Sequence, residues 1–501
     1  MNRNPSSTFV LAALAVLALQ GCSDPPAPRE LSGGEVVDAT LTSLEQSGRY
    51  LVLFASEQVP THFAERVANL GGSIEASLGP IGVAAVTGLT ESAAAELAAG
   101  AGIQAVEPDP IEKLRDAGNE ADDASIDQTA SDVVAPADAT ASPTAAQFYP
   151  RQWNLPAVSA DQAWAAGHLG SREVVVAILD TGIDYLHPDL VGLVDLERSK
   201  SFVPEEDALV EARFPGRRAF SDLYWHGTTV ASVVGSNAKL LAGVNREVTL
   251  IAVKIWNRSF QGPIGRLLTG IVYATDQGAD VINVSGGYDR DKSKNPGIVA
   301  ALERAANYAF RKGALLVSAS FNDAADLDHN GDLVRFPCEA AQAICASATG
   351  PTAGVGVNGP WTDVDARALN AQGPYSGFGR SAIGVAAPGG SGEPGQFRRF
   401  WAACPTTWTE TTEPLACKFE ECRRHDAPRK RDCVAQGRGT SFAAPTVAGL
   451  AALLVAQLGH GNPALIRARI LDSADDRGAP GTDPYYGRGR INIARALGII
   501  E

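Results

Sequence analysis

Four short runs of almost continuous apolar residues constrain the fold of this chain more than any other feature. These runs are residues 173–179, 250–255, 281–285 and 314–318. They are too short for buried helices and rich in Val, Ile and Leu, so they predict parallel strands that are buried on both faces. A sheet built from such strands needs a layer of helices on each side.

Segments between these runs have the spacing of core-facing helices. One carries apolar residues at i, i+3, i+4, i+7 and i+8, starting from Ile264. Another runs from residue 299 to residue 309 and is followed by Gly313, a residue typical of a helix C-terminus. Strands that alternate with helices predict an α/β domain over residues 148–501, with a doubly wound and mostly parallel sheet.

A second, smaller domain is predicted over residues 49–112. Strands are expected at residues 50–54, 73–77, 83–86 and 103–107, and helices at residues 61–70 and 91–99. Thr90 before the second helix is a typical N-cap. The order β-α-β-β-α-β is that of a ferredoxin-like α+β domain. Residues 113–147 are then a flexible linker, because residues 116–146 have almost no large apolar side chains with which to form a core.

The first 21 residues have the pattern of an export signal. Residues 9–19 form an apolar run that is too short to span a bilayer comfortably. Residues 19–22, Leu-Gln-Gly-Cys, resemble the lipobox of bacterial lipoproteins, although Gln20 departs from its usual small residue. This resemblance implies a lipid on Cys22, followed by a tether over residues 22–48. The protein would then be a lipoprotein anchored at the outer membrane or cell surface, and cleavage of the predicted domain at residues 49–112 would release it. The alternative is ordinary signal-peptidase cleavage nearby.

The cysteine count supports export. If Cys22 carries a lipid, six of the seven cysteines remain, and an even number in an exported chain predicts disulfides. Cys338 and Cys345 are close enough in sequence for a local bridge. The other four lie in a charged segment with little core of its own, which predicts two bridges within it in any of three pairings; they are Cys404, Cys417, Cys422 and Cys433. The net charge of -15 argues against nucleic-acid binding.

Three polar residues stand at positions suited to catalysis. Asp180 follows the strand at residues 173–179, and ligands of open α/β sheets bind beyond the carboxyl ends of the strands. His226 begins a helix of small residues. Ser441 lies in the sequence Gly-Thr-Ser-Phe-Ala-Ala-Pro at residues 439–445, where a Gly-rich approach turns into an apolar helix. Each motif alone is common in proteins of unrelated function.

Together, and in the order Asp, His, Ser, these motifs resemble the signature of the subtilisin family of serine peptidases. The resemblance covers about residues 152–497. It implies a serine endopeptidase that acts on extended polypeptides through an acyl-enzyme on Ser441, with His226 as the base and Asp180 orienting it, and needs no cofactor for catalysis. The domain at residues 49–112 resembles the family's prosegment, which implies an inhibitory prodomain.

The same resemblance implies an oxyanion hole made by the Ser441 backbone N–H and the Asn322 side chain. The family has an Ala-Gly-Asn turn here, whereas this chain has Ser320, Phe321 and Asn322. If Phe321 must adopt a positive φ, the conformation is strained. Two alternatives therefore stay open: Asn322 is an ordinary turn residue, or the protein is a catalytically impaired lipoprotein that binds peptides.

Two further segments have weaker signals. Ser285, Gly286 and Gly287 resemble the family's edge segment that pairs with extended substrate, the alternative being a Gly-rich loop without that role. Four alternating residues resemble the front of a calcium loop; they are Asp326, Asp328, Asn330 and Asp332. The Glu expected at the end of such a loop is replaced by Pro337, which favours a solvated acidic loop, although family members often bind structural calcium. Residues 198–225 and 391–435 are insertions relative to the family.

Overall fold

The computed structural model describes residues 48–114, 125–126, 142–353, 363–365, 369–370, 373–391, 399–407 and 433–501. The chain divides into two compact units, Met1–Ser43 and Leu44–Glu501. The predicted signal peptide, most of the tether and Cys22 lie outside the described residues, as does most of the predicted linker.

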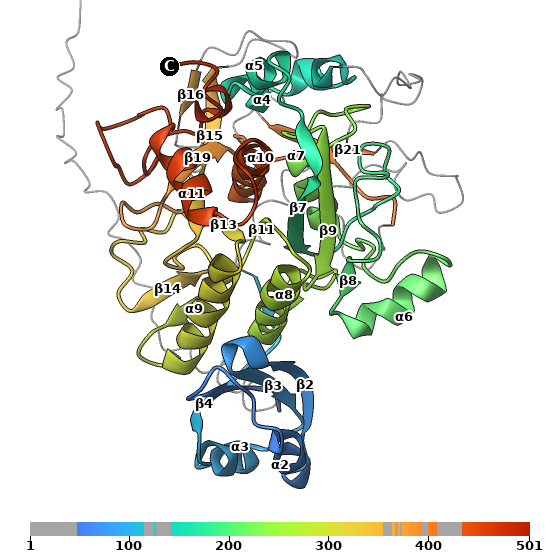
Figure 1. Ribbon diagram of the computed structural model, residues 1–501, viewed down its shortest axis with the longest axis vertical. Coiled ribbons are helices and arrows are strands. Elements are labelled where there is room, and N and C mark those ends of the chain that lie inside the picture. The colour runs from blue at the N-terminus through green and yellow to red at the C-terminus, as the bar shows by residue number, and fades with distance from the viewer. Residues whose placement is uncertain are drawn as a thin grey trace, which may run out of the picture. The chain divides into compact units, whose positions relative to one another are not determined.

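The small N-terminal domain has the predicted order of elements (Figure 1). They are β1 (Tyr50–Phe54), α2 (Phe63–Asn69), β2 (Ser73–Leu78), β3 (Val83–Thr87), α3 (Glu91–Ala98) and β4 (Ile103–Pro108). The strands form an antiparallel sheet in the order β2-β3-β1-β4. The Thr90 hydroxyl accepts a hydrogen bond from the Ala93 N–H, so it caps α3 as its sequence context predicted.

The large domain is built on an eight-stranded sheet in the order β16-β15-β13-β11-β7-β9-β8, with β19 also paired to β15. Its strands are β7 (Gly170–Asp180), β8 (Lys200–Ser201), β9 (Glu247–Lys254), β11 (Val281–Val284), β13 (Leu315–Ala319), β15 (Ile344–Ala353), β16 (Asp363–Asp365) and β19 (Val385–Pro388). Every pairing in it is parallel except that of β15 with β16. The prediction of a doubly wound, mostly parallel α/β fold is confirmed.

Strand β7 shows why the apolar runs are continuous. Val174, Val176 and Ile178 lie in the hydrophobic cluster on one face of the sheet, whereas Val175, Ala177 and Leu179 lie in the cluster on the other. Successive side chains of a strand point to opposite faces, so a strand covered by helices on both sides needs apolar residues at every position.

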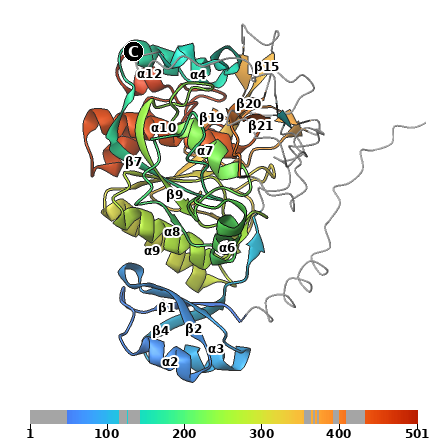
Figure 2. The ribbon, with the colours of Figure 1, turned by 90° about the vertical axis from the view of Figure 1, so that its right-hand side faces the viewer.

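Helices cover both faces (Figures 1 and 2). α8 (Ile264–Asp276) and α9 (Pro296–Arg311) lie toward the N-terminal domain, and α7 (His226–Val234), α10 (Thr440–Leu458) and α11 (Pro463–Asp472) lie on the other face. The short helices α4 (Asn154–Ala157), α5 (Ala160–Ala165) and α12 (Ile493–Ala496) complete that layer. In the described part of the chain, α10 alone is long and apolar enough to cross a membrane, but 83% of its most apolar window is buried inside the protein.

The two insertions contribute elements of their own. The first supplies α6 (Pro204–Arg213), and the second supplies β20 (Phe400–Ala403) and β21 (Val434–Gly437), which form a small sheet with β6 (Ser125–Ile126). The remaining strands form short pairs: β5 (Glu112–Lys113) with β10 (Gln261–Gly262), β12 (Tyr288–Asp291) with β14 (Leu333–Phe336), and β17 (Leu369–Asn370) with β18 (Gly373–Pro374). The predicted linker was placed two residues too early, because Lys113 belongs to β5 and Leu114 is buried.

Two disulfides are present among the described residues. One joins Cys338 to Cys345, and the other joins Cys404 to Cys433. Both agree with the prediction of one local bridge and of further bridges confined to the second insertion. Of the three pairings left open for the insertion, only one joins Cys404 to Cys433. Cys417 and Cys422 lie outside the described residues.

Candidate active site

The structure pairs Asp180 with His226 at the carboxyl end of β7 and places Ser441 on the helix that packs against the one His226 begins. Asp180 is the last residue of β7, His226 is the first residue of α7, and Ser441 lies in the first turn of α10, which packs against α7. All three are at most 1% exposed. His226 Nδ1 lies 2.9 Å from both carboxylate oxygens of Asp180. The carboxylate therefore fixes the orientation of the imidazole, whose Nε2 is left as the atom for proton transfer.

Ser441 is hydrogen-bonded to Ser285, the first residue of the segment predicted to bind substrate. Its hydroxyl donates to the Ser285 carbonyl oxygen at 3.1 Å, and the Ser285 hydroxyl donates to the Ser441 carbonyl oxygen at 3.2 Å. Gly286 and Gly287 follow. A Cβ on Gly286 would lie 2.9 Å from the Trp256 ring, and one on Gly287 would lie 2.0 Å from a backbone oxygen. The two glycines are therefore required by close packing.

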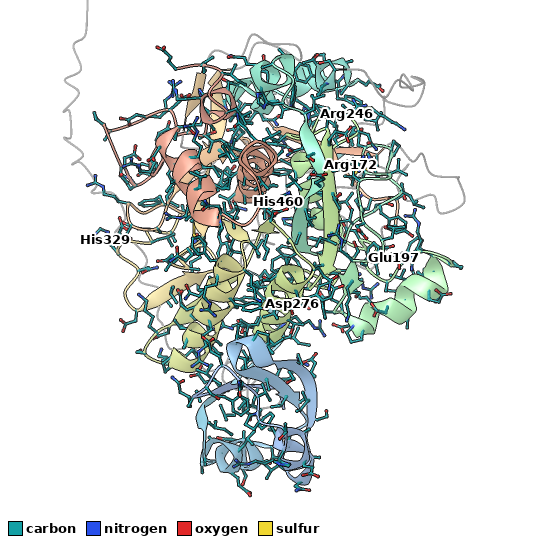
Figure 3. The ribbon with its side chains drawn as sticks, in the orientation of Figure 1. Arg172, Glu197, Arg246, Asp276, His329 and His460 are labelled. Carbon is teal, nitrogen blue, oxygen red and sulfur yellow. A yellow bond between two sulfur atoms is a disulfide. The ribbon has the colours of Figure 1, made fainter. Side chains whose placement is uncertain are left out.

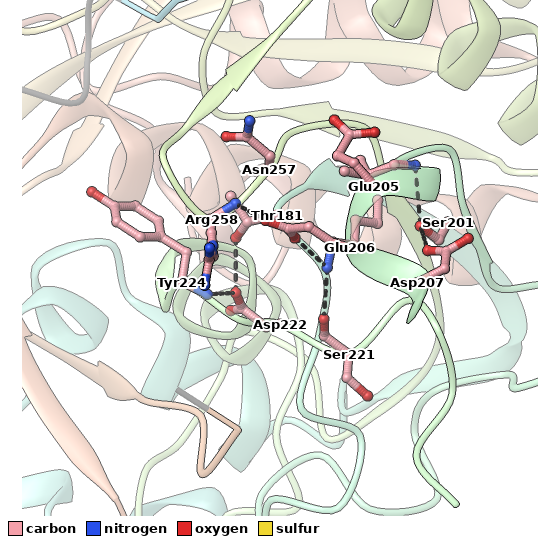
Figure 4. A network of polar contacts seen from close by, with 12 residues as sticks. Thr181, Ser201, Glu205, Glu206, Asp207, Ser221, Asp222, Tyr224, Asn257 and Arg258 are labelled. Carbon is pink, nitrogen blue, oxygen red and sulfur yellow. Dashed lines mark hydrogen bonds and ion pairs between the residues drawn. The ribbon is translucent and has the colours of Figure 1, made fainter. Parts of the chain in front are cut away.

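A buried carboxylate that the sequence analysis missed holds the start of α7. Asp222 accepts hydrogen bonds from the Tyr224 N–H and the Thr181 hydroxyl (Figure 4). It also accepts the Thr228 N–H and hydroxyl, and all four distances lie between 2.7 and 3.0 Å. Burial raises its pKa to about 6, against the opposing effect of the Thr228 hydrogen bonds. Asp222 thus fixes the turn that presents His226. An acidic residue just before a helix start was the signal that could have found it.

A buried ion pair connects the first insertion to the site (Figure 4). Lys254, at the end of β9, is 0% exposed; its Nζ lies 2.8 Å from Glu206 of α6 and donates to the Ser221 carbonyl oxygen at 3.0 Å. The other Glu206 oxygen accepts the Arg258 N–H. Glu206 therefore holds α6 against the loop that leads into β10. Separating the pair would be unfavourable, because it would leave a buried charge without its partner.

Asn322 is held beside Ser441 by its amide oxygen. That oxygen accepts hydrogen bonds from the Thr440 N–H at 2.9 Å and from the Thr440 hydroxyl at 3.1 Å. Thr440 directly precedes Ser441. The group of Asn322 that can donate to a substrate is therefore its amide nitrogen, next to the N-terminus of α10.

Phe321 adopts the strained conformation that the sequence analysis considered. Its φ is 66°, and the ring is completely buried. Such a conformation costs about 1–3 kcal/mol in a residue other than Gly. The Arg335 guanidinium lies over the ring, 4.4 Å from its centroid, and donates to the Ser320 carbonyl oxygen at 2.7 Å. These contacts offset the strain, so the departure from the family's Gly leaves Asn322 bonded to Thr440.

Arg335 also connects the segment that follows Gly287 to the segment that follows Asn322. It donates to both oxygens of Asp289 in β12, which follows Gly287 closely, and to both oxygens of Asp323, which follows Asn322, at distances of 2.6 to 3.1 Å. The Arg335 side chain is only 2% exposed. A planar guanidinium can satisfy two carboxylates, a carbonyl and a ring at once, which an ammonium cannot.

We therefore expect Arg335→Lys to lower the free energy of unfolding by about 2–4 kcal/mol. Denaturant unfolding of the variant, in a Ser441→Ala background to prevent self-digestion, measures the effect. Arg172→Lys is the matched control, because Arg172 forms a half-exposed ion pair with Glu247 (Figure 3). That change should cost less than about 1 kcal/mol. Equal losses in the two variants would contradict the structural role given to Arg335.

The structure does not gather the predicted calcium ligands Asp326, Asp328, Asn330 and Asp332. Asp328 instead accepts the N–H groups of Arg380 and Ser381, and Asp326 contacts the exposed ring of His329 (Figure 3). Within the described ranges, no group of three His, Cys, Asp or Glu side chains is placed to hold a metal ion. The Asp326 and Asp328 carboxylates are thus engaged by other groups of the protein, and calcium binding by these four residues stays a prediction.

The site includes a strand that the sequence did not indicate. β5 of the N-terminal segment pairs antiparallel with β10, and the Leu114 N–H donates to the Phe260 carbonyl oxygen at 3.1 Å. The Phe260 ring lies 4.6 Å from the His226 ring, between centroids. Phe260 therefore contacts this extended segment through its carbonyl oxygen and His226 through its ring. Two-residue strands have no periodicity to detect, which is why β5 and β10 were not predicted.

Comparison with known proteins agrees with this geometry. Residues 171–489 match the model of the subtilase family. The chain is 28% identical to thermitase of Thermoactinomyces vulgaris, over 70% of this chain and 97% of that protein. It is also 28% identical to subtilisin DY of Bacillus licheniformis, over 69% and 97%. The epidermin leader peptide processing serine protease of Staphylococcus aureus has the same fold, with a TM-score of 0.64 at 20% identity, over 90% of this chain and 98% of that one.

The fold, the site and these relatives define a serine endopeptidase. The chain belongs to the subtilase family.

Proposed function

We propose that this protein is an exported endopeptidase that cleaves peptide bonds through the triad Asp180, His226 and Ser441. The observation that carries the proposal is the buried Asp180–His226 pair, whose helix α7 packs against the helix that carries Ser441. Ser441 Oγ attacks the substrate carbonyl while His226 Nε2 takes its proton and then returns it to the leaving amine. Water attacks the resulting acyl-enzyme by the same route. Asp180 stabilises the imidazolium formed in each step.

The developing oxyanion is stabilised by the Ser441 backbone N–H and the Asn322 amide nitrogen. Such donors act in a site that excludes water and are already oriented when charge develops. The bonds from Thr440 to the Asn322 amide oxygen support this role, because they hold the amide in one orientation. The positive end of α10 adds to the stabilisation.

The N-terminal domain acts as an intramolecular inhibitor in this proposal. Its Glu107 accepts the N–H groups of Gly297 and Ile298 at the start of α9, and its Asp109 accepts those of Ile264 and Gly265 at the start of α8. Carboxylates stabilise the positive ends of helices and satisfy their unpaired N–H groups. The domain thus covers the N-terminal ends of α8 and α9. Its last strand, β5, pairs with β10, the edge where substrate would bind in this proposal.

A fluorophosphonate probe tests the function directly. An active serine peptidase forms one covalent adduct per site, and peptide mapping should find it on Ser441. The competing hypothesis, a lipoprotein that binds peptides without cleaving them, predicts no adduct and no burst of product. No feature of the described site favours that alternative, since Phe321 leaves Asn322 in contact with Thr440.

We further propose that a lipid on Cys22 anchors the protein to the membrane. The support is the lipobox-like sequence of residues 19–22. Two or more acyl chains give stable anchoring, so Cys22→Ser should move the protein from the membrane fraction to the soluble fraction. Fractionation followed by immunoblotting measures this, with Cys417→Ser as a matched cysteine control that should stay in the membrane. Retention of the Cys22→Ser protein in membranes would rule the anchor out.

A further inference from the structure

The segment Glu112 to Leu114 lies in the site in the manner of a bound peptide. It is extended, pairs with β10, and ends next to the ring of Phe260, which packs on His226. Side chains of an extended peptide alternate between the enzyme and solvent. Here Leu114 is buried and Glu112 is partly buried, whereas Lys113 between them is exposed. Two of the three side chains therefore face the protease.

Glu112 meets a cation that the protease holds in place. Its carboxylate contacts both terminal nitrogens of Arg290 in β12, and the Arg290 side chain is only 12% exposed. Arg290 also lies over the Tyr288 ring, 5.5 Å from its centroid. The Tyr288 hydroxyl in turn donates to the Gly262 carbonyl oxygen of β10 at 2.9 Å. The cation is thus fixed relative to the strand that a substrate would pair with.

Leu114 meets an apolar surface. Its side chain is 2% exposed and belongs to the hydrophobic cluster that contains Trp256 and Phe260. These two rings pack against each other at 5.1 Å between centroids. A polar or charged side chain at this position would be buried without a partner, which is unfavourable.

We propose that the protease selects substrates with an acidic residue followed, two positions later, by a large aliphatic residue, and that it cleaves beyond the aliphatic one. Arg290 recognises the acidic side chain, and the Trp256–Phe260 surface recognises the aliphatic one. The proposal rests on the proposed function, because it assumes that β10 holds substrate as it holds β5.

Quenched fluorescent peptides with the sequence of residues 109–120 test this selection with the unmodified protease. Replacing Glu112 by Lys in the peptide should lower kcat/KM about tenfold or more, since charge-assisted hydrogen bonds to a fixed Arg are replaced by repulsion. Replacing Leu114 by Asp should lower it at least as much. The preference for Glu over Lys should shrink as salt is added.

A charge exchange identifies the residue responsible. The Arg290→Glu protease, produced with Glu112→Lys in its own N-terminal segment to keep the pair matched during maturation, should prefer the Lys peptide over the Glu peptide. Lys312→Glu makes a similar change in charge at an exposed position beyond the far end of α9, and it should keep the original preference.

The outcomes separate this proposal from the function on which it rests. Rates within twofold for the Glu and Lys peptides would overturn the proposal, and so would an Arg290→Glu protease whose preference is unchanged. If the peptides are not cleaved although the fluorophosphonate labels Ser441, the selection is wrong but the peptidase activity stands. If neither cleavage nor labelling occurs, the proposed function fails and this proposal fails with it.

Discussion

Replacement of Ser441 by Ala is expected to abolish peptide hydrolysis, with a loss in kcat of about a millionfold. The Ala side chain has no hydroxyl to form the acyl-enzyme, so the Asp180–His226 pair is left without a nucleophile to activate. If removal of the N-terminal domain is autocatalytic, the same variant should also keep that domain attached. The expected product is then a longer chain that has the wild-type fold but no activity.

Turnover of a quenched peptide and intact mass spectrometry measure the two effects. Ser473→Ala is a suitable control, because the Ser473 hydroxyl donates to the Arg469 carbonyl oxygen at the C-terminus of α11, away from the proposed triad. Undiminished peptide turnover by the Ser441→Ala protein would refute the triad. A shortened Ser441→Ala chain, lacking residues 49–112, would show that another protease removes the N-terminal domain.

Asn322→Ala is expected to lower kcat about 100- to 1,000-fold with little change in KM, because an oxyanion donor acts mainly on the transition state. Asn322→Asp is the sharper variant. Its carboxylate keeps the shape and the acceptor for the Thr440 N–H and hydroxyl, which hold Asn322 in the structure. It replaces the donor with a negative charge, so it should lose at least as much activity as the Ala variant.

Steady-state kinetics normalised to titrated active sites give both constants. If Asn322 is an ordinary turn residue, Asn322→Asp will retain almost full activity, because the turn keeps its hydrogen bonds to Thr440. A loss below about threefold in both variants would therefore remove Asn322 from the oxyanion hole.

Much of the fold could be predicted from local patterns. The run of apolar residues at 173–179 identified β7 because a strand buried on both faces has no polar positions. Thr90 identified the start of α3, since a capping side chain bonds its own helix. The motifs around Asp180, His226 and Ser441 were recognisable for a different reason: together, and in that order, they resemble the signature of the subtilisin family.

The contacts that complete the site come from residues far apart in the sequence, and no local pattern encodes them. Glu206 and Lys254 pair across 48 positions, and Arg335 reaches back to Phe321 and Asp289. The pairing of β5 with β10 depends on how the N-terminal domain docks on α8 and α9. The sequence by itself determined the long strands and helices and their order, because periodicity and capping act within a few residues. The motifs around Asp180, His226 and Ser441 were indicated by their resemblance to a family signature. Only the tertiary structure decided which charges and rings meet, because those partners are chosen by packing.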